Sequence, residues 1–274
     1  MHLNHGPIDL IVEAFGSHSE IDAAYARAND RFSNILNDLV GELKNLRRPL
    51  CSPRWVPDDP VAKRMMGACW PHRGEFVTPM AAVAGSVADE VLAALIEGQD
   101  LERAYVNNGG DIAFYLTPGA TLTAGLVGDY HVPSVNASCT LGFDQPVRGI
   151  ATSGWKGRSY SLGIADSVTV LAETAATADV AATLIANAVN IGDPAIERSP
   201  ASDLDPDSDL GDRLVTNAVG PLDDGAVRAA LDSGVAAANV MQRAGLITAA
   251  VLVLQQQFRT IGSVPAGLIQ EHAA

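Results

Sequence analysis

The stretch Val106-Asn107-Asn108-Gly109-Gly110-Asp111-Ile112-Ala113-Phe114-Tyr115-Leu116 places four turn-forming residues between two apolar runs. Glycine adopts positive φ at little steric cost, and asparagine does so more readily than most residues. The backbone can therefore reverse here, as in a β-hairpin, or come close to a ligand. Two interpretations stay open at this stage: a simple hairpin turn, or a glycine-lined pocket wall with Asp111 at its edge.

Outward from this stretch, helical and strand patterns follow one another without regular alternation. No linker or low-complexity segment divides the chain, which favours one α+β domain over residues 1–274, with mixed or antiparallel sheets and flanking helices. Strands are predicted at 8–15, 103–106, 112–116, 121–127, 149–154, 167–172 and 247–254. Helices are predicted at 20–46, 61–66, 81–97 and 223–244, and another is predicted to run to about Asn190 with Thr174 or Thr177 as its cap.

Composition narrows the class of protein. The chain has 274 residues, 47% of them hydrophobic, and a formal net charge of −14, which argues against a nucleic-acid surface. It leaves room for a small phosphate-bearing ligand, since one basic group, a helix N-terminus or a metal ion suffices. Three cysteines without a Cys-x-x-Cys pair favour a reducing cytoplasm. The run Ala244 to Leu254 is too short to cross a membrane, and no membrane partner is expected.

Two patterns resemble metal sites without completing one. Cys69 and His72 have metal-ligand spacing, but no second ligand pair follows, so a structural role is favoured. Residues 203–209 are rich in aspartate like a calcium loop. Neither the required glycine nor the terminal glutamate falls into place, which favours a solvated loop.

The sharpest local feature is the pair Asp179 and Thr183, four residues apart near the start of a predicted helix. That spacing puts a carboxylate and a hydroxyl on one helix face, one turn apart. They could form part of an oxygen shell for Mg²⁺, which takes few protein ligands. The alternative is first-turn chemistry, with Asp179 favoured by the helix dipole and Thr183 bonded to the preceding turn.

Four ordered segments together resemble the ApbE-type flavin transferases. They are Ala82–Asp89, Val106–Ile112, Ile150–Gly154 and Ala178–Thr183. The longer stretch Ala151-Thr152-Ser153-Gly154-Trp155-Lys156-Gly157-Arg158-Ser159-Tyr160-Ser161-Leu162-Gly163, continuing through Ala165–Val170, is similar to the UPF0280 branch of that superfamily.

The resemblance implies an ApbE-like fold with a flavin site. Enzymes of the family cleave FAD at its pyrophosphate and transfer FMN, through a phosphoester, to a Thr or Ser of an acceptor protein. The metal ligands that it implies are Asp179, Thr183 and a backbone carbonyl at Val83, with Asp179 and Thr183 serving catalysis through Mg²⁺. The residues that it implies for nucleotide binding are Asn107, Asn108, Gly109, Gly110, Asp111, Thr152, Ser153, Gly154 and Arg158, with Lys156 as an alternative phosphate partner.

This sequence departs from the family pattern at two places, and the family's usual N-terminal motif is not apparent. Ala84-Gly85 stands where the transferases have Lys-Gly, and the family's His-x-x-Asp-Pro-x-Thr-Gly loop is replaced by residues 160–166. Two hypotheses follow. The first is a Mg²⁺-dependent, FAD-using FMN transferase or FAD-cleaving enzyme. The second is a non-catalytic relative that binds a flavin or another small anion in a redox or sulfur pathway. A homodimer formed through the Ala- and Val-rich helices is a further expectation.

Overall fold

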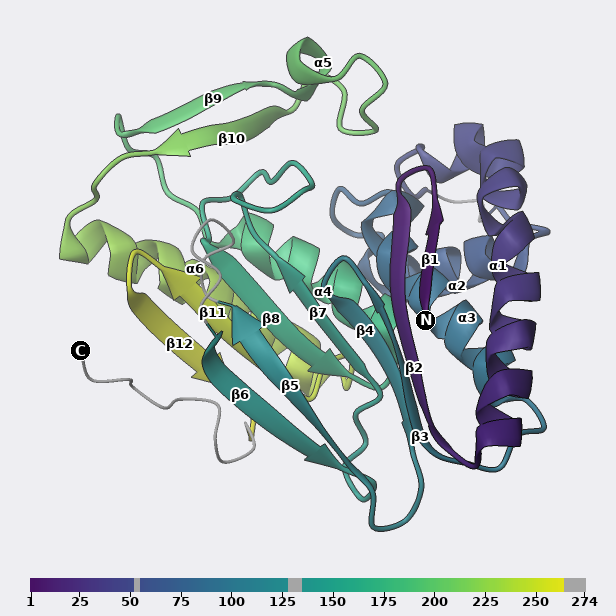
Figure 1. Ribbon diagram of the computed structural model, residues 1–274. Coiled ribbons are helices and arrows are strands. Elements are labelled where there is room, and N and C mark those ends of the chain that lie inside the picture. The colour runs from purple at the N-terminus through teal and green to yellow at the C-terminus, as the bar shows by residue number, and fades with distance from the viewer. Residues whose placement is uncertain (52–54, 128–134, 264–274) are drawn as a thin grey trace. The chain divides into compact units, whose positions relative to one another are not determined.

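The computed structural model describes residues 1–51, 55–127 and 135–263 (Figure 1). The chain divides into two compact units whose segments alternate along the sequence. Unit 1 comprises Met1–Leu122, Gly142–Ala151 and Ala172–Val180. Unit 2 comprises Thr123–Leu141, Thr152–Leu171 and Ala181–Ala274. The single domain predicted from the sequence stays a prediction.

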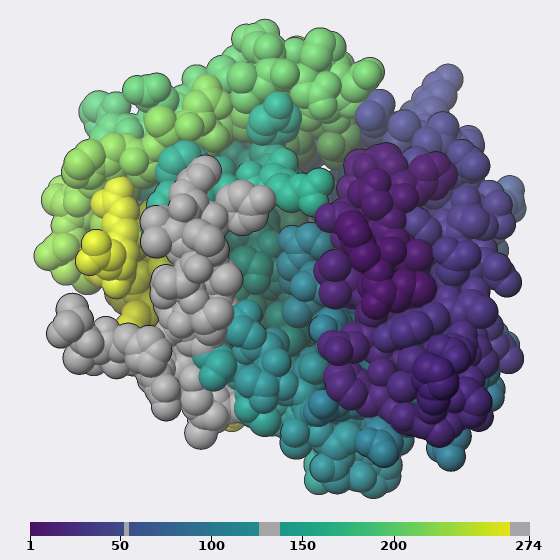
Figure 2. Space-filling model, viewed as in Figure 1, coloured from purple at the N-terminus to yellow at the C-terminus, as the bar shows by residue number. Residues whose placement is uncertain are grey.

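Unit 1 contains an antiparallel sheet with strands in the order β1-β2-β3-β4-β7. Helices α1 and α3 pack against each other and against this sheet. Residues of β1 and β2 (purple) lie at the surface in Figure 2. The elements that begin in this unit are β1 (His2–His5), β2 (Ile8–Gly16), α1 (His18–Leu46), α2 (Pro60–Cys69), η1 (Trp70–His72), η2 (Pro79–Ala82), α3 (Val83–Ile96), β3 (Leu101–Asn108), β4 (Asp111–Leu116), β5 (Thr121–Val127), β7 (Gly149–Ser153) and α4 (Ala175–Ala188).

Unit 2 contains the antiparallel strands β8, β11 and β12, against which α6 packs through β11 and β12. Strands β9 and β10 form a separate two-stranded sheet. The elements that begin in this unit are β6 (Val135–Gly142), β8 (Ser167–Ala172), β9 (Ile196–Pro200), α5 (Ala201–Leu204), β10 (Leu214–Val219), α6 (Asp224–Arg243), β11 (Ala249–Leu254) and β12 (Gln257–Ile261). The α+β class with antiparallel sheets is confirmed.

Local sequence explains where several helices begin and which face they bury. Asp59 accepts a hydrogen bond from the Ala62 amide and Pro60 opens α2, the usual chemistry of a helix start. At the start of α4, the Thr174 hydroxyl accepts the Thr177 amide. The buried face of α1 recurs every three or four residues, as the periodicity predicts: Ala24, Ala28, Phe32, Ile35 and Leu39.

The structure corrects the sequence-based map at several strands. Strands β1, β6, β9, β10 and β12 were not expected. The acidic segment 199–212, expected to be a loop, begins with the end of β9 and the short helix α5. Short strands with few β-branched or alternating apolar residues give no periodic signal, because their partners rather than their own sequence hold them.

One described segment, Pro79–Ile96, has the length and apolar composition of a membrane span. It comprises η2 and α3, and half of it is buried. Because α3 packs against α1, β3 and β4 within unit 1, its apolar character is that of a core helix.

Candidate functional site

The stretch Val106–Leu116 contains a tight β-hairpin turn between β3 and β4. Asn108 pairs with Asp111, and Gly109 and Gly110 have φ of 64° and 113°. Asn107 closes the turn, because its side-chain carbonyl accepts the Gly110 amide at 2.8 Å. The hairpin interpretation is confirmed, and both glycines occupy the left-handed region that favours them.

The hairpin is attached to the first turn of α3. The buried Asn108 side chain donates to the Ala84 carbonyl at 3.1 Å. Two of the four resembling segments, Ala82–Asp89 and Val106–Ile112, therefore meet in unit 1.

Helices α3 and α4 cap each other through two aspartates. The Asp179 carboxylate of α4 accepts the Gly85 amide of α3 at 2.9 Å. In return, the Asp89 carboxylate of α3 accepts the amides of Ala175 and Ala176 in α4, at 3.0 and 2.9 Å. Amide groups at a helix start lack partners in their own helix, and a carboxylate there also meets the positive end of the helix dipole. Through Asp179, a third resembling segment, Ala178–Thr183, therefore contacts the segment Ala82–Asp89.

Close backbone packing makes this exchange of caps geometrically feasible. A Cβ atom on Gly85 would lie 2.3 Å from the Ala175 carbonyl oxygen. A Cβ on Gly149, at the start of β7, would lie 2.1 Å from the Thr174 carbonyl carbon. Both glycines are required because the start of α4 rests directly on their backbone.

Electrostatically, Asp179 is the unusual member of the pair. Burial raises its pKa to about 7, and the charge of Asp89 adds to that effect, while amide hydrogen bonds from Gly85 and Ala84 oppose it. No basic side chain in the described part of the chain forms an ion pair with Asp179. The pKa of Asp89 is also raised, chiefly by burial, while the amide hydrogen bonds from Ala176 and Ala175 and, to a smaller extent, the charge of Arg64 oppose this. Asp179 is therefore a half-buried carboxylate that lacks a counter-cation.

Thr183 lies one turn after Asp179 in α4 and is half-buried. Its hydroxyl makes no hydrogen bond with the residues that the structure describes. Val83, the third predicted ligand, is the first residue of α3 and is also half-buried. The bond from Thr183 to the preceding turn, the alternative that the sequence offered, is absent from the described hydrogen bonds.

Unit 1 also buries the side chains of Cys69, His72 and Ser86. Burial raises the pKa of the Cys69 thiol well above its ordinary value, with a further contribution from Asp179, so the thiol stays protonated. The His72 Nε2 and Ser86 Oγ atoms are buried without a hydrogen-bond partner. No three His, Cys, Asp or Glu residues within 1–51, 55–127 and 135–263 cluster as metal ligands. The structural role of Cys69 and His72 stays a prediction.

The remaining predicted nucleotide-binding residues lie in unit 2, at and after the end of β7. Thr152 is exposed, and its hydroxyl lies 2.8 Å from that of Thr169. Ser153 is half-buried and Arg158 is exposed. Gly154 is buried, and a Cβ there would lie 2.4 Å from the Asp166 carbonyl oxygen.

Sequence reasoning missed the roles of Asp89 and Asp166. Asp89 belongs to a resembling segment, but its partners lie 86 and 87 residues away, so no local pattern identifies its capping role. Asp166 holds Trp155, Lys156 and the backbone of Gln255 in unit 2. The small-residue run around Gly85 is the signal that could have indicated a close contact between helices.

Comparison with known proteins relates the chain to one family. A family model described as "AbpE bacteria" matches residues 1–260. A UPF0280 protein from Methanothermobacter thermautotrophicus is 41% identical over 159 residues, or 57% of this chain and 53% of the relative. Another, from Methanothrix thermoacetophila, is 33% identical over 186 residues, or 62% and 74% of the two chains. The match thus spans about half the length of the first relative.

Among solved structures, the chain is similar to a mutant form of the flavin transferase ApbE from Vibrio cholerae. The identity is 15% and the TM-score 0.47, with 96% of this chain and 97% of that chain covered. The ApbE protein of Thermotoga maritima is 16% identical, with a TM-score of 0.39 and coverage of 91% and 77%. The match over residues 1–260, together with the UPF0280 relatives, shows that this chain belongs to the ApbE-like family, in its UPF0280 branch.

Proposed function

We propose that this protein is an ApbE-like enzyme that uses FAD and Mg²⁺, cleaving the FAD pyrophosphate to transfer or release FMN. The observation that carries the proposal is the Asp179 carboxylate, which is half-buried, has a like-charged neighbour in Asp89 and has no basic partner among the described residues. A carboxylate in this situation is stabilised by a bound cation, because the cation supplies the positive charge that the protein does not.

The oxygen atoms of the three predicted ligands are of the kind that Mg²⁺ prefers. Asp179 offers carboxylate oxygens, Thr183 a hydroxyl one turn later in α4, and Val83 a backbone carbonyl. Mg²⁺ prefers oxygen ligands, binds through few protein groups and leaves the remaining positions to water and substrate phosphates. The lack of a described three-residue cluster of His, Cys, Asp or Glu is compatible with such a site.

Bound there, Mg²⁺ would neutralise charge that develops on the phosphates during displacement. In the proposed transfer, an acceptor hydroxyl oxygen forms a bond to the phosphorus on the FMN side. The P–O bond to AMP breaks, AMP leaves with the electron pair, and the hydroxyl proton passes to solvent. Water in place of the acceptor hydroxyl gives free FMN and AMP.

Each remaining predicted residue has a chemical role in this proposal. The turn Asn107–Asp111 lets the backbone approach the nucleotide, since Gly109 and Gly110 carry no side chain there. Thr152 and Ser153, followed by Gly154, supply hydroxyls at the end of β7, and Arg158 or Lys156 supplies a positive charge for phosphate.

A second candidate function is binding of a flavin or another small anion without transfer. Two departures favour it: Ala84 replaces the lysine of the transferases, and residues 160–166 lead directly to β8 in place of their His-containing loop. Without these groups the chain would retain a cation and phosphate site but lose part of the surface for flavin and acceptor. We also retain as proposals a single ApbE-like domain over residues 1–274, a cytoplasmic location and a homodimer.

Incubation with FAD separates the two functions. The wild-type protein with FAD and 5 mM Mg²⁺, a concentration chosen to exceed ordinary Mg²⁺ affinities by roughly tenfold, should release AMP together with FMN or an FMN-modified protein, detected by mass spectrometry. EDTA and Asp179→Ala should abolish release, whereas Asp207→Ala, in the exposed acidic loop, should not. Binding of FAD without release would favour the second function, and neither binding nor release would exclude both flavin proposals.

A further inference from the structure

A second carboxylate, Asp166, organises a turn in unit 2. Its side chain is only 11% exposed and lies just before β8. The Asp166 carboxylate lies 3.1 Å from the Lys156 ammonium and accepts the Trp155 indole N–H at 3.3 Å. Its other oxygen accepts the Gln255 amide at 2.6 Å. One carboxylate thus joins the Trp155–Arg158 turn to the β11–β12 turn.

The base of the Trp155–Arg158 turn is fixed by backbone contacts as well. The Trp155 amide donates to the Ala165 carbonyl at 3.0 Å, and the Gly157 amide donates to the Gly154 carbonyl at 3.1 Å. Gly154 packs so closely on the Asp166 backbone that any side chain there would collide with it. The turn is therefore held in one conformation without a ligand, which lowers the entropic cost of binding one.

The β11–β12 turn that shares Asp166 is strained. Gln255 and Gln256 have φ of 43° and 67°, a region that costs non-glycine residues energy. Gln255 is held by its own side chain too, which accepts the Leu222 amide and donates to the Gly220 carbonyl. Such backbone persists only where surrounding contacts over-determine it, and it concentrates at functional sites.

The two basic residues of the Trp155–Arg158 turn have different partners. Lys156 is paired with Asp166, so its charge is already neutralised. Arg158, two residues later, is exposed and makes no hydrogen bond or ion pair with any described residue. A guanidinium on a fixed turn presents parallel N–H donors that match two phosphate oxygens. Arg158 also lies only a few residues after Thr152 and Ser153, the residues predicted to supply hydroxyls.

We propose that Asp166 is a positioning residue that holds the Trp155–Arg158 turn, so that Arg158, and not Lys156, binds a phosphate group of the ligand. This inference rests on the proposed function, which it deepens by assigning the phosphate partner. The ligand class is a phosphate-bearing nucleotide, with inorganic pyrophosphate as its minimal part.

Calorimetric binding of FAD and of inorganic pyrophosphate tests the assignment. Arg158→Ala should weaken both by about 10-fold to 100-fold, the range for a charge-assisted hydrogen-bonded contact, and should reduce the dependence of binding on salt. Arg228→Ala, which removes an exposed arginine from α6, is the charge-matched control and should bind as wild type does.

The positioning role predicts non-additivity. Asp166→Asn should weaken binding less than Arg158→Ala does, and the double variant should bind no more weakly than Arg158→Ala alone, because Asp166 acts through Arg158. Additive losses would overturn the positioning role. Equal binding of both probes by Arg158→Ala and wild type would overturn the assignment of Arg158, and this surface variant keeps the test decisive if Asp166→Asn does not fold. Failure of wild type to bind either probe would overturn it as well.

The proposed function can fail separately. If Arg158 is required for pyrophosphate binding but the wild-type protein releases neither FMN nor AMP from FAD, the enzymatic proposal is wrong and this inference stands. If wild type and Arg158→Ala bind and cleave FAD equally, the enzymatic proposal stands and this inference is wrong.

Discussion

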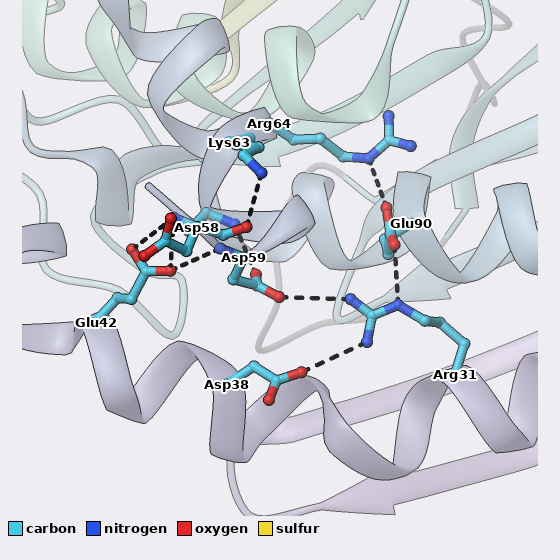
Figure 3. A network of polar contacts seen from close by, with 9 residues as sticks. Arg31, Asp38, Glu42, Asp58, Asp59, Lys63, Arg64 and Glu90 are labelled. Carbon is cyan, nitrogen blue, oxygen red and sulfur yellow. Dashed lines mark hydrogen bonds and ion pairs between the residues drawn. The ribbon is translucent and has the colours of Figure 1, made fainter. Parts of the chain in front are cut away.

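Asp89 and Glu90 are neighbours in α3, yet their carboxylates meet opposite kinds of partner. Glu90 lies between two arginines, with Arg31 Nε and Arg64 Nε each at 2.9 Å, and Arg31 also contacts Asp59 at 3.6 Å (Figure 3). Burial would raise the pKa of Glu90, but the hydrogen bonds from these arginines outweigh it, and the pKa is lowered.

The Asp89 and Asp179 pair instead meets backbone amides. Burial raises the pKa of both carboxyl groups, and Asp179 has no basic partner in the described part of the chain. Where the protein supplies the counter-charge, as at Glu90, the carboxylate serves stability. Where it supplies only dipoles, as at Asp179, the carboxylate is suited to a cation from solution.

The largest expected effect on stability comes from the close backbone contact between Gly85 and Ala175, next to the Asp89 and Asp179 pair. Gly85→Ala would force a methyl group to 2.3 Å from the Ala175 carbonyl oxygen, which is backbone and cannot rotate away. The helix starts must separate, so we expect a loss of about 3 kcal/mol or more in the free energy of unfolding, measured in urea. Gly41→Ala is the matched control. Nothing lies within 4 Å of its Cβ position in α1, and it should stabilise by ~0.5–1 kcal/mol. Equal effects of the two substitutions would contradict the close contact.

The next largest effect on stability is expected at Glu90, which pairs with two arginines. Glu90→Gln removes the charge that Arg31 and Arg64 share, leaving two part-buried guanidinium groups less well compensated. We expect a loss of about 3 kcal/mol by urea unfolding at pH 7. Glu97→Gln, which breaks the exposed pair with Arg27, should change stability by less than ~0.5 kcal/mol. A loss for Glu90→Gln no larger than that of this control would show that the network is not structural.

Part of the fold follows from the local sequence, and part depends on contacts between residues far apart in the chain. The Asn-Gly hairpin, the periodic helices and the Thr174 cap follow from local chemistry and were predictable. The exchange of caps between α3 and α4 was not, because each aspartate serves a helix distant in sequence. Strand β12 was missed because Gln255-Gln256 carries no turn signal and is held in its conformation by Asp166 and its own side chain.

For the candidate site, the predicted roles of the residues stay predictions. Residues of three of the four resembling segments contact one another in unit 1. Asp179 was predicted from its spacing to Thr183, whereas its lack of a counter-cation depends on which side chains the fold brings near it. The sequence named Arg158 with Lys156 as its alternative, and the ion pair of Lys156 with Asp166 is a difference between them that the sequence does not show.

A separate effect should appear in the pH dependence of stability. The pKa of Asp179 is about 7 in the folded protein and about 3.9 in an unfolded chain. Between these values the folded state binds the extra proton, so this group makes stability fall as pH rises from about 4 to about 7. Without Mg²⁺, Asp179→Asn should flatten that slope, measured by urea unfolding across this range. An unchanged slope would show that Asp179 is not the titrating group.

The smallest effect concerns the strained turn. Gln256→Gly places a residue that tolerates φ of 67° at an exposed position, relieving strain at the cost of a more flexible unfolded chain. We expect a stabilisation of up to ~1 kcal/mol, seen as a small rise in Tm. A clear destabilisation would mean that the Gln256 side chain makes a contact worth more than the strain.

The contrast between Glu90 and Asp179 is tested most directly by titrating Mg²⁺ into the purified protein at pH 8, where Asp179 is ionised. Calorimetry should show one Mg²⁺ bound per wild-type chain, and Asp179→Asn should weaken that binding by at least about tenfold. In wild type, Mg²⁺ at 100 times its Kd should add about 2.7 kcal/mol to the free energy of unfolding. Identical Mg²⁺ titrations for wild type and Asp179→Asn would contradict the claim that Asp179 holds the cation.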